Sequence, residues 1–235
     1  MRTPNRTSVA ARAFGLALLL AGAATAASAR DWPQWLSQYY QAPEPDRVVT
    51  AAFELSRSGY FDEAGRTTEA IGFFAGVFQR NPERVAEWTA AFRDLPRAHQ
   101  RLMAAALWCA GSPRGAEQLE RLAREGRSSL RAEIEQLVAK PAPELASTPV
   151  RSEASLNLQW GAFLATGEAQ HIVSVLMALG SREPGVSGRA REVLAEKAAA
   201  HPRVYAICQA QLEKQPQPIR EQLHALLSEA QPQRM

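Results

Sequence analysis

The chain has 235 residues, of which 46 % are hydrophobic, and it carries 27 Lys and Arg against 24 Asp and Glu. This hydrophobic content is typical of a chain that buries a core, and it argues against a disordered protein. The length allows one large helical domain or two small ones.

The first 29 residues predict a cleavable signal peptide. Three arginines and no acidic residue accompany an apolar run over residues 14–27, and Ala27, Ser28 and Ala29 give the small-x-small pattern of a cleavage site. The apolar run is shorter than the roughly 20 residues of a membrane-spanning helix. We therefore expect cleavage after Ala29, a periplasmic or secreted mature chain, and no membrane span in that mature chain.

Loss of residues 1–29 also changes the charge balance. It removes three arginines and no acidic residue, so the mature chain has 24 residues of each sign and a formal net charge of zero. Binding to nucleic acid through phosphate needs a basic excess or a basic stripe. The sequence therefore predicts no nucleic-acid partner.

Aromatic residues gather at the start of the mature chain and again in residues 158–180. At the start, helical spacing places Trp32, Trp35 and Tyr39 on one face of a helix that begins beside Pro33. Such a helix could cover the edge of a core, or it could offer an aromatic surface to a partner. As an interaction surface, the candidate residues are Trp32, Trp35, Tyr39, Tyr40, Trp160 and Phe163.

Residues 45–139 repeat apolar residues at helical spacing, and Pro or Gly punctuates the runs. Residues 60–66 read as a polar loop, and Asn81 is the predicted N-cap of the helix after it. Gly72 and Gly76 lie four residues apart on one helix, where they would let a neighbouring helix approach closely. The helices predicted here begin at Pro45, Thr67, Pro82, Arg97, Pro113 and Ser128.

Residues 141–152 contain three prolines and predict a linker. This linker divides the mature chain into an N-terminal helical subdomain, residues 30–140, and a C-terminal helical subdomain, residues 153–230. Residues 231–235 are expected to fray.

Residues 158–180 form the most hydrophobic segment of the mature chain. The apolar residues on both sides of Gly167 recur at helical spacing, which predicts two short helices around a glycine break with other helices packed against them. A polar loop over residues 181–188 and three further helices should follow. The sequence thus predicts an all-α fold, an irregular stack of antiparallel helical hairpins with about ten to twelve helices and no sheet.

Cys109 and Cys208 leave two alternatives open. An exported protein meets an oxidising compartment, where these residues could form one disulfide. Both also lie in apolar helical patterns, where free cysteine packs as a small hydrophobic residue.

No motif for catalysis, a cofactor or a metal is present. The four histidines, His99, His171, His201 and His224, lack the i, i+4 spacing of a helical zinc site. His201 precedes Pro202 at a predicted helix start, where a capping role is favoured over metal binding. We therefore expect no cofactor, no metal site and no catalytic residue, which argues against an enzyme.

The segment Trp160-Gly161-Ala162-Phe163-Leu164-Ala165-Thr166-Gly167, with His201-Pro202-Arg203-Val204 downstream, resembles an uncharacterised family of exported bacterial all-helical proteins. The resemblance covers mainly residues 153–230 and implies an exported helical domain without catalytic residues. The architecture is also loosely similar to tetratricopeptide-type helical hairpins, but that repeat's period is not kept.

These observations favour an exported, non-catalytic adaptor module that binds a protein partner in a groove between its two halves. Two alternatives stay open. One is a periplasmic immunity or inhibitor protein that covers a toxin or hydrolase, and the other is an enzyme whose site has no recognisable motif.

Overall fold

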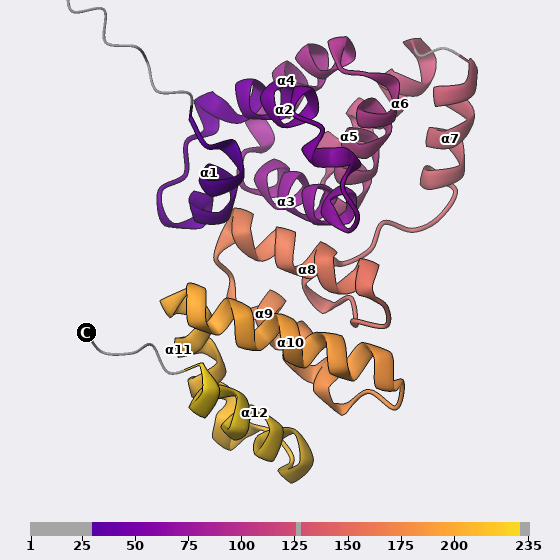
Figure 1. Cartoon of the computed structure of the whole chain (residues 1–235). Coiled ribbons are helices and arrows are strands. Elements are labelled where there is room, and N and C mark those ends of the chain that lie inside the picture. The colour runs from indigo at the N-terminus through magenta and orange to yellow at the C-terminus, as the bar shows by residue number, and fades with distance from the viewer. Residues whose placement is uncertain (1–29, 126–127, 231–235) are drawn as a thin grey trace, which may run out of the picture. The chain divides into compact units, whose positions relative to one another are not determined.

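The computed structural model describes residues 30–125 and 128–230, and within these ranges it contains twelve α-helices and no strand (Figure 1). The predicted all-α class and helix number are therefore confirmed. The predicted signal peptide and the tail 231–235 lie outside the described residues. The helices are α1 Trp32–Gln38, α2 Val48–Arg57, α3 Arg66–Arg80, α4 Val85–Ala91, α5 Arg97–Ala110, α6 Pro113–Glu125, α7 Ser128–Val138, α8 Glu153–Thr166, α9 Ala169–Met177, α10 Pro184–Ala200, α11 Pro202–Gln211 and α12 Gln217–Glu229.

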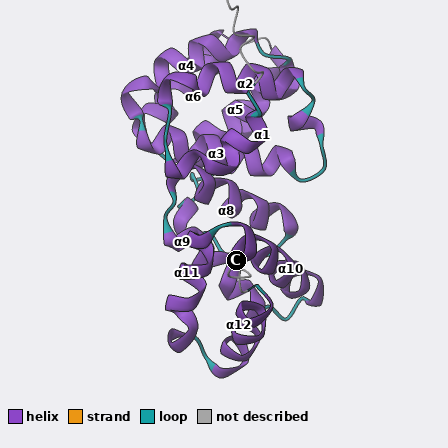
Figure 2. Ribbon diagram, turned by 60° about the vertical axis from the view of Figure 1, so that its left-hand side comes forward, coloured by secondary structure: helices purple, strands orange, loops and turns teal. Residues whose placement is uncertain are grey.

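Capping residues set several of these boundaries, and most consecutive helices are joined by short loops, with a longer connection between α7 and α8 (Figure 2). The Asp31 side chain accepts a hydrogen bond from the Gln34 N–H at 2.9 Å and so caps α1. Gly111 follows α5 with φ +61° and Gly167 follows α8 with φ +66°, a conformation that glycine adopts without steric cost. The predicted glycine break between α8 and α9 is confirmed.

Three local predictions are wrong. Asn81 does not cap the following helix, because its Nδ2 donates back to the Val77 carbonyl at the end of α3. The segment predicted as a polar loop over residues 60–66 contains a 3-10 turn, Tyr60–Asp62, whose two aromatic side chains are buried. The loop predicted over residues 181–188 is shorter, because α10 already begins at Pro184.

Among the described helices, α3 and α8 form the most extensive contact, and they lie side by side in Figures 1 and 2. A Cβ atom built on Gly72 would lie 2.0 Å from the Leu158 carbonyl oxygen, and one on Gly161 would lie 1.8 Å from the Glu69 carbonyl oxygen. Only glycine therefore allows the two backbones to approach this closely. The predicted role of Gly72 is confirmed, and α8 is the helix that approaches.

This contact connects the residues on the two sides of the Pro-rich segment 141–152. The described residues after Arg30 form one compact unit, with a single hydrophobic core cluster that draws on both sides of the segment. The division into subdomains 30–140 and 153–230 stays a prediction.

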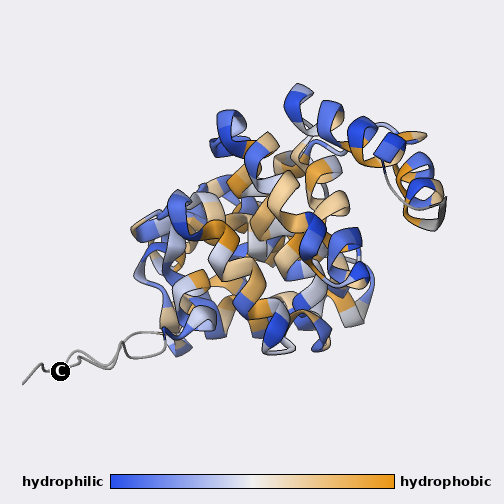
Figure 3. Ribbon diagram, turned by 90° about the horizontal axis from the view of Figure 1, so that it is seen from above, coloured by the Kyte–Doolittle hydropathy of each residue, from blue (hydrophilic) through white to orange (hydrophobic). Residues whose placement is uncertain are grey.

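The core is rich in aromatic side chains. Phe73, Phe74 and Phe78 of α3, Trp88 of α4 and Phe163 of α8 are fully buried. Figure 3 shows the hydrophobic residues concentrated on the inner sides of the helices, with polar residues towards the outside. Among the helices in the described ranges, none combines the length and the apolar character needed to cross a membrane.

Both cysteines are free and buried, Cys109 in α5 and Cys208 in α11. Of the two alternatives for this pair, the structure therefore has the separate thiols and no disulfide. Burial raises the pKa of the Cys109 thiol to about 11 and that of the Cys208 thiol to about 12. Because the thiolate is the reactive form, both residues act here as small core side chains.

Candidate functional site

The aromatic residues proposed as an interaction surface are mostly inside the protein. Trp35, Tyr39, Trp160 and Phe163 are buried, with Trp35 the most exposed of the four at 7 %, while Trp32 and Tyr40 are half-buried. The interaction-surface prediction is therefore wrong for the four buried residues. The other alternative holds, since α1 covers an edge of the core.

The structure brings these aromatic residues together in two groups. Trp35 and Tyr39 pack edge-to-face at 5.0 Å, and both also pack edge-to-face on Phe73 of α3. Tyr40 and Trp160 instead pack on Phe163, at centroid distances of 5.0 and 5.4 Å. Their aromatic surface is thus used to attach residues 32–41 to α3 and α8.

His201 also differs from its predicted role. Its side chain makes no capping hydrogen bond at the start of α11. Instead its ring packs edge-to-face on Trp160 at 5.2 Å, and its Nδ1 lies 3.4 Å from the Tyr40 hydroxyl. Within the described residues no group of three or more His, Cys, Asp or Glu is placed to hold a metal ion.

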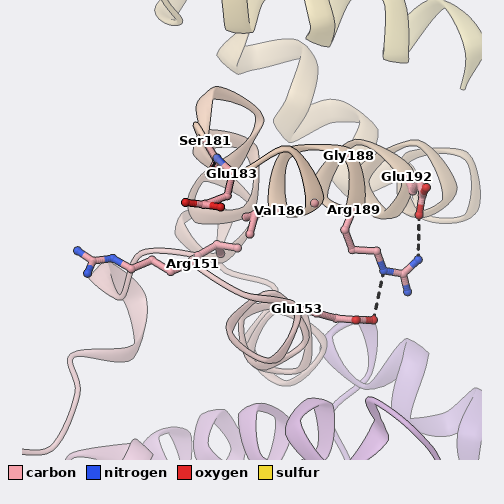
Figure 4. A pocket seen from close by; sticks show the side chains of 10 residues that line it. Arg151, Glu153, Ser181, Glu183, Val186, Gly188, Arg189 and Glu192 are labelled. Carbon is pink, nitrogen blue, oxygen red and sulfur yellow. Dashed lines mark hydrogen bonds and ion pairs between the residues drawn. The ribbon is translucent and has the colours of Figure 1, made fainter.

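The candidate site is an open groove of about 940 Å³ between residues 150–153 and the first half of α10 (Figure 4). Its volume lies in the range of ligand-binding pockets, which is roughly 300–1,000 Å³. The groove lies within residues 150–192, so it is not the groove between two halves that the sequence analysis expected. Five of its ten lining residues are charged: Arg151, Glu153, Glu183, Arg189 and Glu192.

The two ends of the groove differ in their ion pairing. At one end Arg189 of α10 lies 3.4 Å from Glu153 of α8 and 3.1 Å from Glu192, which ties the two walls together. At the other end, the guanidinium group of Arg151 and the carboxylate of Glu183 make no hydrogen bond or ion pair with any described residue. Figure 4 shows both side chains reaching towards the same side. One positive and one negative group are therefore available to a ligand.

The upper wall of the groove depends on where α10 begins. Pro184 occupies the first helical position, where its fixed φ suits a helix and its missing N–H costs nothing. The Ser181 hydroxyl accepts a hydrogen bond from the Glu183 N–H at 3.2 Å and orders the turn before it. Sequence reasoning missed this wall because Gly185 and Gly188 favour a loop. Pro184 at a helix start was the signal that could have found it.

The lower wall is fixed by a buried hydrogen-bond network. Gln159 of α8 donates both N–H groups of its side chain to backbone, to the Leu145 carbonyl at 2.7 Å and the Thr148 carbonyl at 2.9 Å. Its Oε1 lies 2.8 Å from Nδ1 of His171, so the neutral imidazole carries its proton on Nδ1. The network holds residues 145–148 in place. Val150 and Arg151, which line the groove, follow directly along the chain.

Stability should depend on pH through His171. Burial lowers the pKa of His171 below its ordinary value of 6.5, although Glu168 acts to raise it. The unfolded chain therefore binds the proton more readily between the lowered pKa and 6.5, so falling pH in this window favours unfolding. We expect the free energy of unfolding to have its full value above about pH 6.5 and to decrease below that pH. Urea unfolding followed by circular dichroism, at about pH 7.5 and about pH 5.5, measures the decrease.

The variant His171→Gln is the control, because glutamine keeps a donor for Gln159 and does not titrate. Its decrease in stability between the two pH values should be smaller than that of the wild type. A wild-type protein that is equally stable at both pH values would contradict the expected effect.

Comparison with known proteins gives no match to a family model, to a curated protein sequence or to a solved structure.

Proposed function

We propose that this chain is an exported protein-binding module that holds an extended, charged segment of a partner in the groove beside α10. The observation that carries the proposal concerns two opposite charges, Arg151 and Glu183, at the open end of a groove of about 940 Å³. Neither side chain forms an ion pair with another described residue. A peptide with one acidic and one basic side chain complements them.

The electrostatics of the groove support a peptide over a nucleic acid. Its lining has three carboxylates against two guanidinium groups. A polyphosphate backbone binds where basic groups are in excess. Arginine pairs well with a carboxylate through two parallel hydrogen bonds, so an Asp or Glu of the partner suits Arg151.

The walls of the groove support a partner that binds without large rearrangement. One wall belongs to α10 and the other is held by Gln159 and His171, while the Arg189–Glu153 pair joins the two. A preorganised site spends little free energy on ordering itself when a ligand binds. An inhibitor of an exported toxin or hydrolase could use the same groove, so the partner's identity separates these two roles.

Charge reversal in the groove tests the proposal. Peptides of about twelve residues selected from a display library on the mature chain should carry both an acidic and a basic residue. Arg151→Glu and Glu183→Arg should each weaken binding of a selected peptide by about tenfold or more, as expected for the loss of a charge pair and the gain of a repulsion. Calorimetric titration measures the affinity.

Arg57→Glu is the matched control. Arg57 is also an exposed arginine, but it pairs with Glu54 on α2 and does not line the groove. Selected peptides should bind this variant as they bind the wild type. Peptides whose affinity is unchanged by both groove variants would contradict the proposal.

A further inference from the structure

Three polar side chains from different elements form a continuous hydrogen-bonded array outside the groove. The Ser56 Oγ lies 2.7 Å from Nδ1 of His99, and Nε2 of His99 lies 3.2 Å from Oδ1 of Asp62. Ser56 is in the last turn of α2, Asp62 ends the 3-10 turn Tyr60–Asp62, and His99 is in the first turn of α5. No local sequence pattern indicates the array, because its members are spread over 44 positions of the chain.

The geometry assigns the proton of the neutral imidazole. Asp62 accepts from Nε2–H, which leaves the Nδ1 lone pair to accept from the Ser56 hydroxyl. This is the state in which a histidine can take a serine proton, with a carboxylate on its other nitrogen. The roles of the two nitrogens are exchanged relative to the usual serine hydrolase, but either nitrogen of the ring can serve as the base.

The environment of the three groups fits a reactive serine. His99 is buried, and Phe61 packs edge-to-face on its ring at 5.2 Å, which fixes the ring orientation. Ser56 is only half-buried, and the Asp62 side chain is 67 % exposed. Such an exposed carboxylate adds little to stability, and its hydrogen bond to Nε2 holds the imidazole in the tautomer that leaves Nδ1 free to accept.

We propose that Ser56, His99 and Asp62 form a nucleophilic site that reacts with small carboxylic esters. The Ser56 oxygen bonds to the ester carbonyl carbon while His99 Nδ1 takes the hydroxyl proton. The bond to the leaving alcohol breaks as the alcohol receives that proton, which leaves an acyl group on Ser56. Water attacks this acyl group with His99 again as base, and the products are the carboxylic acid and free Ser56. Because Ser56 is half-buried and Asp62 is exposed, the site suits an unhindered ester.

A fluorophosphonate probe tests this site without a known substrate. The serine oxygen displaces fluoride from phosphorus, and intact-mass spectrometry with peptide mapping detects the adduct. We expect one adduct per chain, on Ser56, and none on Ser56→Ala. Asp62→Asn should slow labelling by about 100-fold or more, because the amide no longer holds His99, the general base, in the tautomer that accepts the Ser56 proton.

Two controls keep the test specific. Ser58→Ala should label at the wild-type rate, because the nearby Ser58 hydroxyl donates only to the Leu55 carbonyl. Labelling is measured without any peptide and without the groove variants, so failure of the binding proposal and failure of this one are distinguishable. Asp62 is exposed, so Asp62→Asn should keep the wild-type circular dichroism spectrum. Wild-type protein that gives no adduct on Ser56, or that labels no faster than folded Asp62→Asn, would overturn the proposal.

Discussion

Gly161→Ala should destabilise the protein by at least about 3 kcal/mol, the upper end of the cost of overpacking a core. The added methyl group would lie 1.8 Å from the Glu69 carbonyl oxygen and 2.8 Å from the Phe73 amide nitrogen. Both are backbone atoms of α3, so the clash is relieved only when the two helices separate. That separation weakens the contact between the two sides of the Pro-rich segment. Urea unfolding followed by circular dichroism measures the loss.

Gly188→Ala is the matched control for this prediction. Gly188 also lies within a helix, α10, but a Cβ there would meet no atom within 4 Å. Alanine costs less backbone entropy than glycine in a helix, so this variant should gain about 0.5–1 kcal/mol. If Gly161→Ala were as stable as the wild type, the close approach of α3 and α8 would be wrong.

Phe163→Ala should cost about 3–5 kcal/mol, the usual range for emptying a buried aromatic site. Phe163 is fully buried in α8, where Trp160 stacks on its ring and Tyr40 packs against it. The truncation would leave a cavity at the place where residues 32–41 join the core. Urea unfolding again measures the change, and fluorescence of the five tryptophans gives a second signal.

Met177→Ala is the matched control, because it separates the effect of burial on stability from the effect of hydrophobicity alone. Met177 is also a large apolar residue, but it is 51 % exposed. Its truncation should change stability by no more than about 0.5 kcal/mol. A Phe163→Ala protein with wild-type stability and lost partner binding would instead favour the aromatic interaction surface that the burial of Phe163 argues against.

Local signals predicted much of the fold. The periodic apolar run and the glycine after it placed α5 at Arg97–Ala110, and Gly167 divided α8 from α9 as expected. These features depend on neighbours within a few residues, which the sequence displays directly. Gly72 and Gly76 indicated a close helix contact, but the partner helix lies more than 80 residues further along the chain.

The candidate sites depend on contacts that no local pattern carries. Arg151 and Glu183 are 32 residues apart and meet one groove only because α10 packs beside residues 150–153. Burial of Trp160 is likewise a tertiary property, since aromatic residues at helical spacing suit a core and an interface equally well. The prediction of where α10 begins was wrong for another reason. Pro184 outweighed two glycines whose preference for loops is only statistical.

Photo-crosslinking from the groove tests the proposed binding function most directly. A benzoylphenylalanine placed at Ser181, which lines the groove, is compared with one at His224, which is exposed on α12 outside it. In cells that export the protein, we predict one dominant crosslinked protein from position 181, none from position 224, and loss of that product when Arg151→Glu is added. Equal products from both positions, or no product from position 181, would contradict the assignment of this groove as the partner-binding site.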